Sequence, residues 1–135
     1  MTTCTVKLRL GRLVPNALFT RRSPHSTAER DLTDAIIETA RLLGWRVAHF
    51  RPARTSRGWR TPVAGDGAGF PDLVLVGHGR ILYREIKTER GRLRPEQTAW
   101  IAALREAGAD AGVWTDEDWR LGAIESQLRA PSAAH

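Results

Sequence analysis

Three ionisable side chains in the middle of the chain have the types and spacing of a metal-dependent hydrolytic site. Asp72 follows Pro71, and Glu85 stands one residue before Ile86-Lys87. Two neighbouring carboxylates repel each other unless one takes up a proton or a cation lies between them. Mg²⁺ favours such oxygen ligands, and a bound ion activates water and supports the charge that develops on a phosphate. Lys87 is a point charge that can orient the water or contact the phosphate.

The segment between these side chains predicts an antiparallel hairpin that brings them together. Residues 72–76 and 80–87 are rich in β-branched and apolar side chains, and glycines bound the turn between them. With His78-Gly79 as a two-residue loop, Asp72 lies opposite Glu85, roughly 4.5–5.5 Å away at Cβ, and alternation puts Lys87 on the same face. The other expected pairs are Gly77 with Arg80, Val76 with Ile81 and Val74 with Tyr83, and the apolar residues expected on the opposite face are Leu73, Leu75, Leu82 and Ile86.

The plain alternative is an ordinary surface ion pair between Glu85 and Lys87 on an exposed strand, because Glu-x-Lys is a common tripeptide. Two features of the chain favour the hydrolytic site instead. Pro71-Asp72 stands at the matching position of the hairpin, and Lys87 is one of only two lysines, with Lys7, among the 21 Lys and Arg residues.

A longer stretch around these residues resembles a known family. Gly69-Phe70-Pro71-Asp72 followed by Glu85-Ile86-Lys87 resembles the PD-(D/E)xK nuclease signature. With Lys-Thr-Glu-Arg-Gly-Arg-Leu-Arg-Pro-Glu-Gln at residues 87–97, the chain is similar to the VRR-NUC domain nucleases over about residues 27–119. Small members of that branch occur in phages and bacteria and resemble Holliday-junction resolvases. The resemblance implies a restriction-endonuclease-like core and activity on branched or flapped DNA, and it allows a homodimer.

The first expected helix carries a third acid. Ser26 or Thr27 caps this helix, and Gly44 ends it after apolar residues at helical spacing. Glu29 stands three residues after Ser26, as a capping box requires. The resemblance implies another role, because a glutamate in the first helix of the family completes the metal site. Both roles stay open for Glu29.

The second expected helix begins at Arg94-Pro95, with proline in its first turn, and ends at Gly108. Its inner side carries Gln97. This side chain is either a surface glutamine or, as the resemblance implies, a neighbour of the acidic cluster that supports the phosphate or Lys87.

The chain is basic, with 21 Lys and Arg against 15 Asp and Glu and a net charge of +6. Such a charge suits a polyanionic partner such as DNA, although a GC-rich genome also produces an arginine-rich composition. Residues 51–69 are expected to form a long loop in which arginines flank Trp59, which suits phosphate contact and base stacking. A solvated surface loop is the alternative. The candidate DNA-binding residues are Arg51, Arg54, Arg57, Arg60, Arg92 and Arg94, and His49 and His78 are expected to be core or turn residues.

Length and composition predict one small domain. A chain of 135 residues can bury a core without staples, and the lone Cys4 excludes an internal disulfide and a cysteine-rich zinc site. No apolar run approaches the ~20 residues that span a membrane, and no convincing secretory signal is present, so the expected location is the cytoplasm, of the host cell for a phage protein. The expected divisions are a basic segment at residues 1–26 that folds, exchanges with a partner copy or stays flexible, a nuclease-like domain at residues 27–129 and a tail at residues 130–135.

The expected elements define an α/β fold. Strands at residues 45–50 and 111–114 join the hairpin, and a final helix is expected at residues 116–128, capped by Thr115. The order α-β-β-β-α-β-α gives a mixed sheet of about four strands flanked by helices, because a strand–helix–strand crossover follows the hairpin. The resemblance implies the same architecture.

The sequence therefore predicts a divalent-metal-dependent DNA endonuclease. Asp72, Glu85, the backbone carbonyl of Ile86 and Glu29 would hold Mg²⁺, for which Mn²⁺ substitutes, and Lys87 would position the attacking water. A non-catalytic DNA-binding module with the same fold is one alternative, and the intact acids and lysine argue against it. A sequence-specific restriction enzyme is another, and this chain length leaves little room for a recognition domain.

Overall fold

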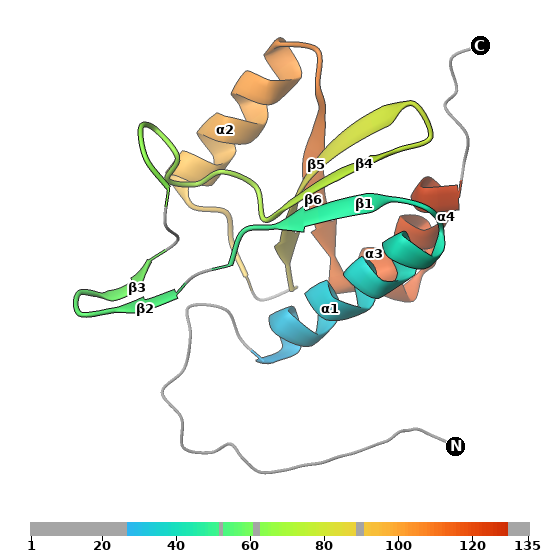
Figure 1. Cartoon of the computed structure of the whole chain (residues 1–135), viewed down its shortest axis with the longest axis horizontal. Helices are drawn as coiled ribbons and strands as arrows, with labels where there is room; N and C mark the ends of the chain where they lie inside the picture. Colours follow the sequence, from blue (N-terminus) through green and yellow to red (C-terminus); the bar gives the residue numbers. More distant parts are fainter. Residues whose placement is uncertain (1–26, 52, 61–62, 89–90, 130–135) are drawn as a thin grey trace.

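A four-stranded sheet with helices on both faces forms the body of the protein (Figure 1). The computed structural model describes residues 27–51, 53–60, 63–88 and 91–129, with the backbone alone for residues 27, 53–55 and 59–60. The expectations for residues 1–26, including Ser26 as a helix cap, and for the tail at residues 130–135 lie outside the described residues. Within the described ranges, no helix combines the length and the apolar character needed to cross a membrane.

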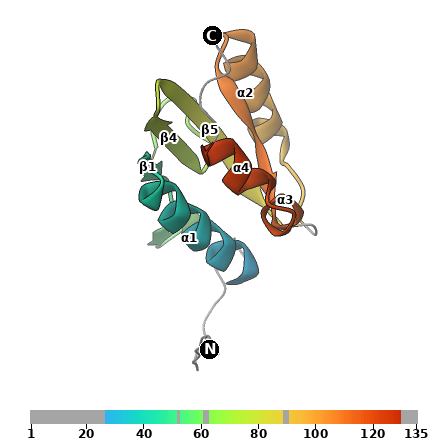
Figure 2. The ribbon, with the colours of Figure 1, turned by 90° about the vertical axis from the view of Figure 1, so that its right-hand side faces the viewer.

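The strand order of the sheet is β1-β4-β5-β6. Its antiparallel part consists of β1 (Arg46–His49), β4 (Leu73–Gly77) and β5 (Arg80–Lys87), and β6 (Asp110–Thr115) runs parallel to β5. On one side of the sheet lie α1 (Thr27–Leu42), α3 (Asp116–Arg120) and α4 (Ala123–Arg129), and on the other lies α2 (Pro95–Glu106) (Figure 1, Figure 2). The predicted mixed α/β sheet flanked by helices is therefore confirmed.

The β4–β5 hairpin has the predicted turn and register. His78 and Gly79 both have positive φ, 52° and 73°, as a type I′ two-residue turn requires. The His78 ring lies against Trp45, and its Nε2 is 2.8 Å from the carbonyl oxygen of Leu43. The pairs are Gly77 with Arg80, Val76 with Ile81 and Val74 with Tyr83, and the last printed pair is Leu73 with Arg84. The next step of this register opposes Asp72 to Glu85, as predicted.

Alternation along the hairpin buries one of its faces completely. Leu73, Leu75, Leu82 and Ile86 have no exposed surface, as predicted. They belong to one core with side chains from α1, β6 and α4, namely Leu32, Ile36, Ala40, Trp114, Ile124 and Leu128. Full burial of one such leucine or isoleucine contributes about 1.5–3 kcal/mol of transfer free energy. The core thus holds the hairpin against α1 and fixes the end of β5 that carries Glu85.

The long loop predicted at residues 51–69 contains an additional hairpin. Strands β2 (Ala53–Thr55) and β3 (Gly58–Arg60) pair antiparallel, with Thr55 opposite Gly58. Three residues per strand are too few for an alternation of apolar and polar side chains to be recognised in the sequence. Gly58, the first residue of β3, follows the turn with φ of 102°. The expectation of a long loop was therefore wrong for the residues of β2 and β3.

The single C-terminal helix predicted at residues 116–128 is two helices. Thr115 caps α3 as predicted, because its Oγ1 accepts a hydrogen bond from the backbone N–H of Asp118 (3.1 Å). The helix stops at Leu121, and Gly122 follows with φ of 81°, a left-handed conformation that ends helices. The change of direction lets α4 bury Ile124 and Leu128 in the core.

Candidate active site

The two predicted acids meet at one end of the β4–β5 hairpin. Asp72 directly precedes β4 and Glu85 lies in β5, and both side chains are buried. The backbone N–H of Ile86 donates a hydrogen bond to Asp72 Oδ2 (3.0 Å), and the backbone N–H of Phe50 donates to the carbonyl oxygen of Asp72 (2.9 Å). Asp72 is therefore attached to the neighbouring strands on both sides, and its carboxylate lies against β5.

Glu85 has one satisfied and one unsatisfied oxygen. Its Oε2 accepts a hydrogen bond from Nε2 of Gln97 (2.8 Å) and lies 3.5 Å from Nζ of Lys87. Its Oε1 is buried and has no hydrogen-bond partner among the described residues. A buried polar atom without a partner costs free energy and is uncommon in folded proteins. A bound cation is a ligand that would satisfy this oxygen.

The electrostatics of Glu85 follow from this environment. Burial, and next the charge of Asp72, raises the pKa of Glu85 to about 8, and the nearby Lys87 opposes the increase. The carboxyl therefore holds a proton near neutral pH unless a positive ion takes the place of that proton.

Gln97 is buried and joins α2 to β5. Its Oε1 accepts a hydrogen bond from the backbone N–H of Arg94 (2.9 Å), the residue that precedes α2. This bond leaves the amide nitrogen directed at Glu85. The sequence allowed either a surface glutamine or a neighbour of the acidic cluster. Gln97 is buried beside the cluster, and it contacts the same oxygen of Glu85 as Lys87 does.

Glu29 lies at the border of this cluster. It is buried in the first turn of α1. A Cβ on Gly91 would lie 3.7 Å from Glu29 Oε2 and 3.2 Å from Cδ of Lys87, so both side chains flank the same glycine. In the described part of the chain, no three His, Cys, Asp or Glu side chains form a group that could hold a metal ion. The geometry thus supplies two adjoining acids, Asp72 and Glu85, and places Glu29 beside the same glycine as Lys87.

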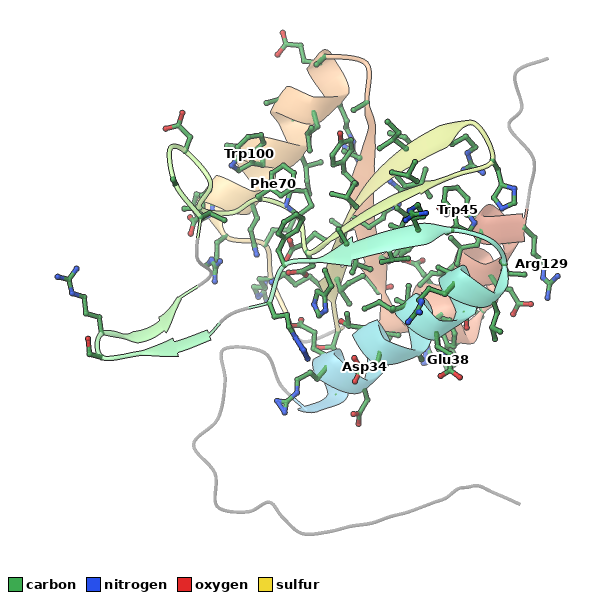
Figure 3. All side chains as sticks on the ribbon, viewed as in Figure 1. Asp34, Glu38, Trp45, Phe70, Trp100 and Arg129 are labelled. Carbon is green, nitrogen blue, oxygen red and sulfur yellow. The ribbon has the colours of Figure 1, made fainter. Side chains whose placement is uncertain are left out.

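An aromatic cluster that the sequence did not predict supports the segment before Asp72. The Phe70 ring makes edge-to-face contacts with Phe50, Tyr83 and Trp100, at 5.5, 6.1 and 5.0 Å between centroids. Phe70 lies beside Trp100, which is a residue of α2 (Figure 3). Trp100 Nε1 also donates a hydrogen bond to the carbonyl oxygen of Asp66 (2.8 Å).

Gly69 lies directly against the start of α2. It has φ of 87°, and a Cβ at this position would lie 2.6 Å from the backbone carbon of Glu96. This contact and the hydrogen bond from Trp100 to Asp66 attach the segment before Asp72 to α2. Through Gln97, the same helix also contacts Glu85.

The candidate DNA-binding residues lie on exposed parts of the chain wherever their side chains are described. Arg51, Arg57, Arg92 and Arg94 are exposed, and Arg94 Nε is 3.1 Å from Oε2 of Glu96. The side chains of Arg54 and Arg60 lie outside the described atoms. Half-buried His49 in β1 and exposed His78 in the turn do not belong to the acidic pair.

The fold and the site define a class of protein, an α/β domain whose sheet presents a buried acid pair beside a lysine and a glutamine. A family model of the VRR-NUC domain matches residues 36–116. The chain therefore belongs to the VRR-NUC family of nuclease domains, which confirms the resemblance seen in the sequence.

The chain is similar to Hjc, a Holliday junction resolvase from the archaeal hyperthermophile Archaeoglobus fulgidus, with 20% sequence identity and a TM-score of 0.37. The match covers 67% of this chain and 68% of that chain. No curated protein matches this chain.

Proposed function

We propose that this protein is a divalent-metal-dependent endodeoxyribonuclease. The observation that carries the proposal is the buried Oε1 of Glu85, which has no hydrogen-bond partner among the described residues and belongs to a carboxyl beside Asp72 and Lys87. A purely structural carboxyl at this depth would be expected to have partners for both oxygens. Membership in a nuclease family supports the same reading of the site.

The donor set fits Mg²⁺, with Mn²⁺ as a substitute. Asp72 and Glu85 would hold the ion, together with the backbone carbonyl of Ile86, and Glu29 would hold the ion or its water. When bound, the ion supplies positive charge at the scissile phosphate and favours ionisation of water.

Lys87 and Gln97 have separate roles in the proposed reaction. Lys87 would orient the attacking water by a hydrogen bond from Nζ, or contact the phosphate. The water loses one proton to solvent as its oxygen bonds to phosphorus, the bond to the 3′-oxygen breaks in line, and a proton from solvent water neutralises that oxygen. Gln97 would hold Oε2 of Glu85 and thereby leave Oε1 available, since one carboxylate oxygen is already occupied.

The exposed arginines would bind the DNA backbone. The proposed substrate is branched or flapped DNA, and the proposed nuclease acts as a homodimer. Arg51, Arg57, Arg92 and Arg94 are exposed, and Arg54 and Arg60 belong to the β2–β3 hairpin. Arginine can bind phosphate through two parallel hydrogen bonds. Such a substrate would place the protein in the cytoplasm, of the host cell if a phage encodes it.

A cleavage assay tests the proposal. Purified protein is incubated with labelled junction, flap, linear duplex and single-stranded DNA, with Mg²⁺ or with EDTA. The expected result is Mg²⁺-dependent cutting that favours branched DNA and is lost in Asp72→Asn, Glu85→Gln and Lys87→Ala. Glu38→Gln is the matched control, because Glu38 is an exposed acid on α1 away from the site (Figure 3). Near-normal cutting by any of the three site variants would contradict the proposal.

A further inference from the structure

An exposed aromatic ring lies next to the acid pair. Phe50 directly follows β1 and is 38% exposed. The register of β1 with β4 ends at His49 with Leu73, and the hydrogen bond from the backbone N–H of Phe50 to the carbonyl oxygen of Asp72 (2.9 Å) continues it by one residue. Residues opposed in this way share a face of the sheet, with Cβ atoms roughly 4.5–5.5 Å apart. The side chain of Phe50 is therefore a direct neighbour of the Asp72 carboxylate.

Three other aromatic rings support Phe50 without burying it. Phe70 contacts Phe50 edge-to-face, with 5.5 Å between the ring centroids, and contacts Tyr83 and Trp100 in the same way. The three supporting rings are half-buried, and the main core, on the other face of the β4–β5 hairpin, contains none of the four. Edge-to-face contacts favour one orientation of each ring, so Phe50 presents a fixed aromatic surface. The aromatic cluster, as it is called below, consists of Phe50, Phe70, Tyr83 and Trp100.

The aromatic cluster borders both acids. Phe70 precedes Asp72 by two residues, and Tyr83 precedes Glu85 by two residues on the same face of β5. Two residues of an antiparallel strand span about 7 Å. A DNA strand whose phosphate lies at the acid pair would therefore carry the adjoining base to the cluster.

The charges near Phe50 match a nucleotide better than an apolar protein segment. Arg51 is the next residue and is exposed, and Nζ of Lys87 lies 3.5 Å from Oε2 of Glu85 at the acid pair. A nucleotide joins a flat aromatic base to a phosphate, so it requires a ring and a cation close together. Proteins that bind single-stranded nucleic acid combine these two features, because bases stack on aromatic side chains beside basic residues.

We propose that Phe50 stacks against an unpaired DNA base that belongs to the nucleotide beside the scissile phosphate. This inference rests on the proposed function and narrows its substrate. A base inside a duplex has its faces covered by the neighbouring base pairs, so only an unpaired base offers a face to the ring. Among branched DNAs, those with unpaired nucleotides next to the cut, such as a flap, are therefore preferred over fully paired ones. Stacking requires no particular base, because every base has a π-face.

Binding to flapped DNA from which single bases have been removed tests the proposal. An abasic residue is moved one nucleotide at a time through the flap and the branch point, and affinity is measured by fluorescence anisotropy in EDTA, so that no DNA is cut. For the wild type, removal of the base at one position should weaken binding about tenfold. Phe50→Leu keeps an apolar side chain but has no ring. It should bind the intact flap about tenfold more weakly and lose nothing further at that position, because the two changes remove the same contact.

Three controls separate stacking from a structural role of Phe50. Phe50→Trp keeps an aromatic ring, so it should retain the base dependence and quench a 2-aminopurine placed at the same position. Phe50→Leu should bind fully paired linear duplex as the wild type does. Leu42→Ala removes an apolar side chain that is 80% exposed at the end of α1, and it should bind every DNA like the wild type.

The outcomes distinguish this inference from the proposed function. Equal abasic penalties in the wild type and Phe50→Leu at every position overturn the stacking contact. An equal weakening of flap and linear duplex binding by Phe50→Leu overturns it as well. Mg²⁺-dependent cleavage without coupling between Phe50 and a base would count against stacking alone. Coupling without cleavage of any DNA would support the stacking contact and count against the nuclease alone.

Discussion

Arg84 and Glu85 are consecutive residues of β5 and both are buried, but their partners differ completely. Nη1 of Arg84 donates hydrogen bonds to the carbonyl oxygens of Tyr83 and Asp110, at 3.0 and 2.8 Å. Nη2 lies 2.8 Å from Asp110 Oδ1, and the guanidinium is 5.0 Å from the centre of the Trp114 ring. Glu85, on the opposite face, keeps an oxygen that no described residue satisfies.

The difference separates a buried ionisable group whose partners all lie within the fold from one that has an oxygen available to a ligand. Burial lowers the pKa of Arg84, and its hydrogen bond to Asp110 acts in the opposite direction. The contacts of Arg84 join β5 to β6, and Gln127 brings α4 into the same network. Replacing Arg84 should therefore change stability, and replacing Glu85 should change activity.

The largest expected effect is on catalysis by Glu85→Gln. The amide can still accept the hydrogen bond from Gln97, but it cannot replace a carboxylate that holds a cation. Cleavage should fall about a hundredfold to a thousandfold, as for other losses of transition-state electrostatic stabilisation. The melting temperature without metal should be unchanged or higher, because the buried carboxyl is replaced by a neutral group. Single-turnover cleavage and thermal unfolding measure the two effects, and a variant that cuts normally would remove the distinction between the two residues.

The next effect is on stability, in Arg84→Met. The substitution keeps the stem and leaves Asp110 and two backbone carbonyls without their donor. Because Asp110 is half exposed, the free energy of unfolding should fall by about 2–3 kcal/mol. Arg129→Ala is the control, since its exposed pair with Glu125 (2.8 Å) should contribute only about 0.3–0.5 kcal/mol. Denaturant titration distinguishes the variants, and equal losses would show that the network around Arg84 is dispensable.

A third effect, on the pH dependence of stability, belongs to Glu85. Without metal, the pKa of Glu85 is about 8 in the folded protein, against the ordinary value of 4.5 in the unfolded chain. Between these two pH values the folded protein holds a proton on Glu85 and the unfolded chain does not. The free energy of unfolding contributed by this group therefore falls as pH rises through that window. Glu85→Gln should lack this component. Melting curves from pH 5 to 8 measure it, and an identical slope in both proteins would contradict the raised pKa.

A bound divalent metal ion should offset the loss of folding stability that Glu85 causes as pH rises. Mg²⁺ or Mn²⁺ at ten times its Kd should stabilise the folded state by about 1.4 kcal/mol, or roughly 3–6 °C in melting temperature. The gain should be larger at pH 8 than at pH 6, because protons compete with the ion for Glu85. It should disappear in Asp72→Asn, with sodium chloride at matched ionic strength as the control for screening.

The smallest expected effect is that of Trp100→Phe, which removes one hydrogen bond and keeps a ring against Phe70. The loss of the Nε1 bond to Asp66 should cost about 1 kcal/mol of stability. Cleavage should fall only a few-fold, with metal affinity affected more than DNA binding, because the segment before Asp72 loses a tether. A loss of DNA binding alone would instead place Trp100 in the DNA interface.

The sequence predicted the hairpin and its acid pair because both depend on local rules. Turn chemistry at His78-Gly79 fixes the register, and alternation then determines which side chains share a face. The same rule places Arg84 among the core residues, but its partners Asp110 and Gln127 stand 26 and 43 positions away. No local pattern encodes such partners, since they depend on how β6 and α4 pack.

The other differences have similar causes. The hydrogen bond from Gln97 to Glu85 depends on the distance between a helix start and a strand, which helix capping signals do not contain. The break between α3 and α4 had a signal in Gly122, but helical spacing on both sides of it favoured one helix. The roles of Asp72, Glu85, Lys87, Glu29 and Gln97 in catalysis remain predictions that the proposed assays test.

Gly69 has a consequence for how this protein tolerates sequence change. Its positive φ and its 2.6 Å approach to the Glu96 backbone leave no space for a side chain between two parts of the main chain. A library of all substitutions at this position, selected for DNA cleavage, should therefore return glycine alone, although residue 69 has no chemical group to contribute. The same library selected only for soluble expression should return other small residues too, so the ratio of the two selections would measure how strictly the spacing between α2 and Asp72 limits mutational tolerance.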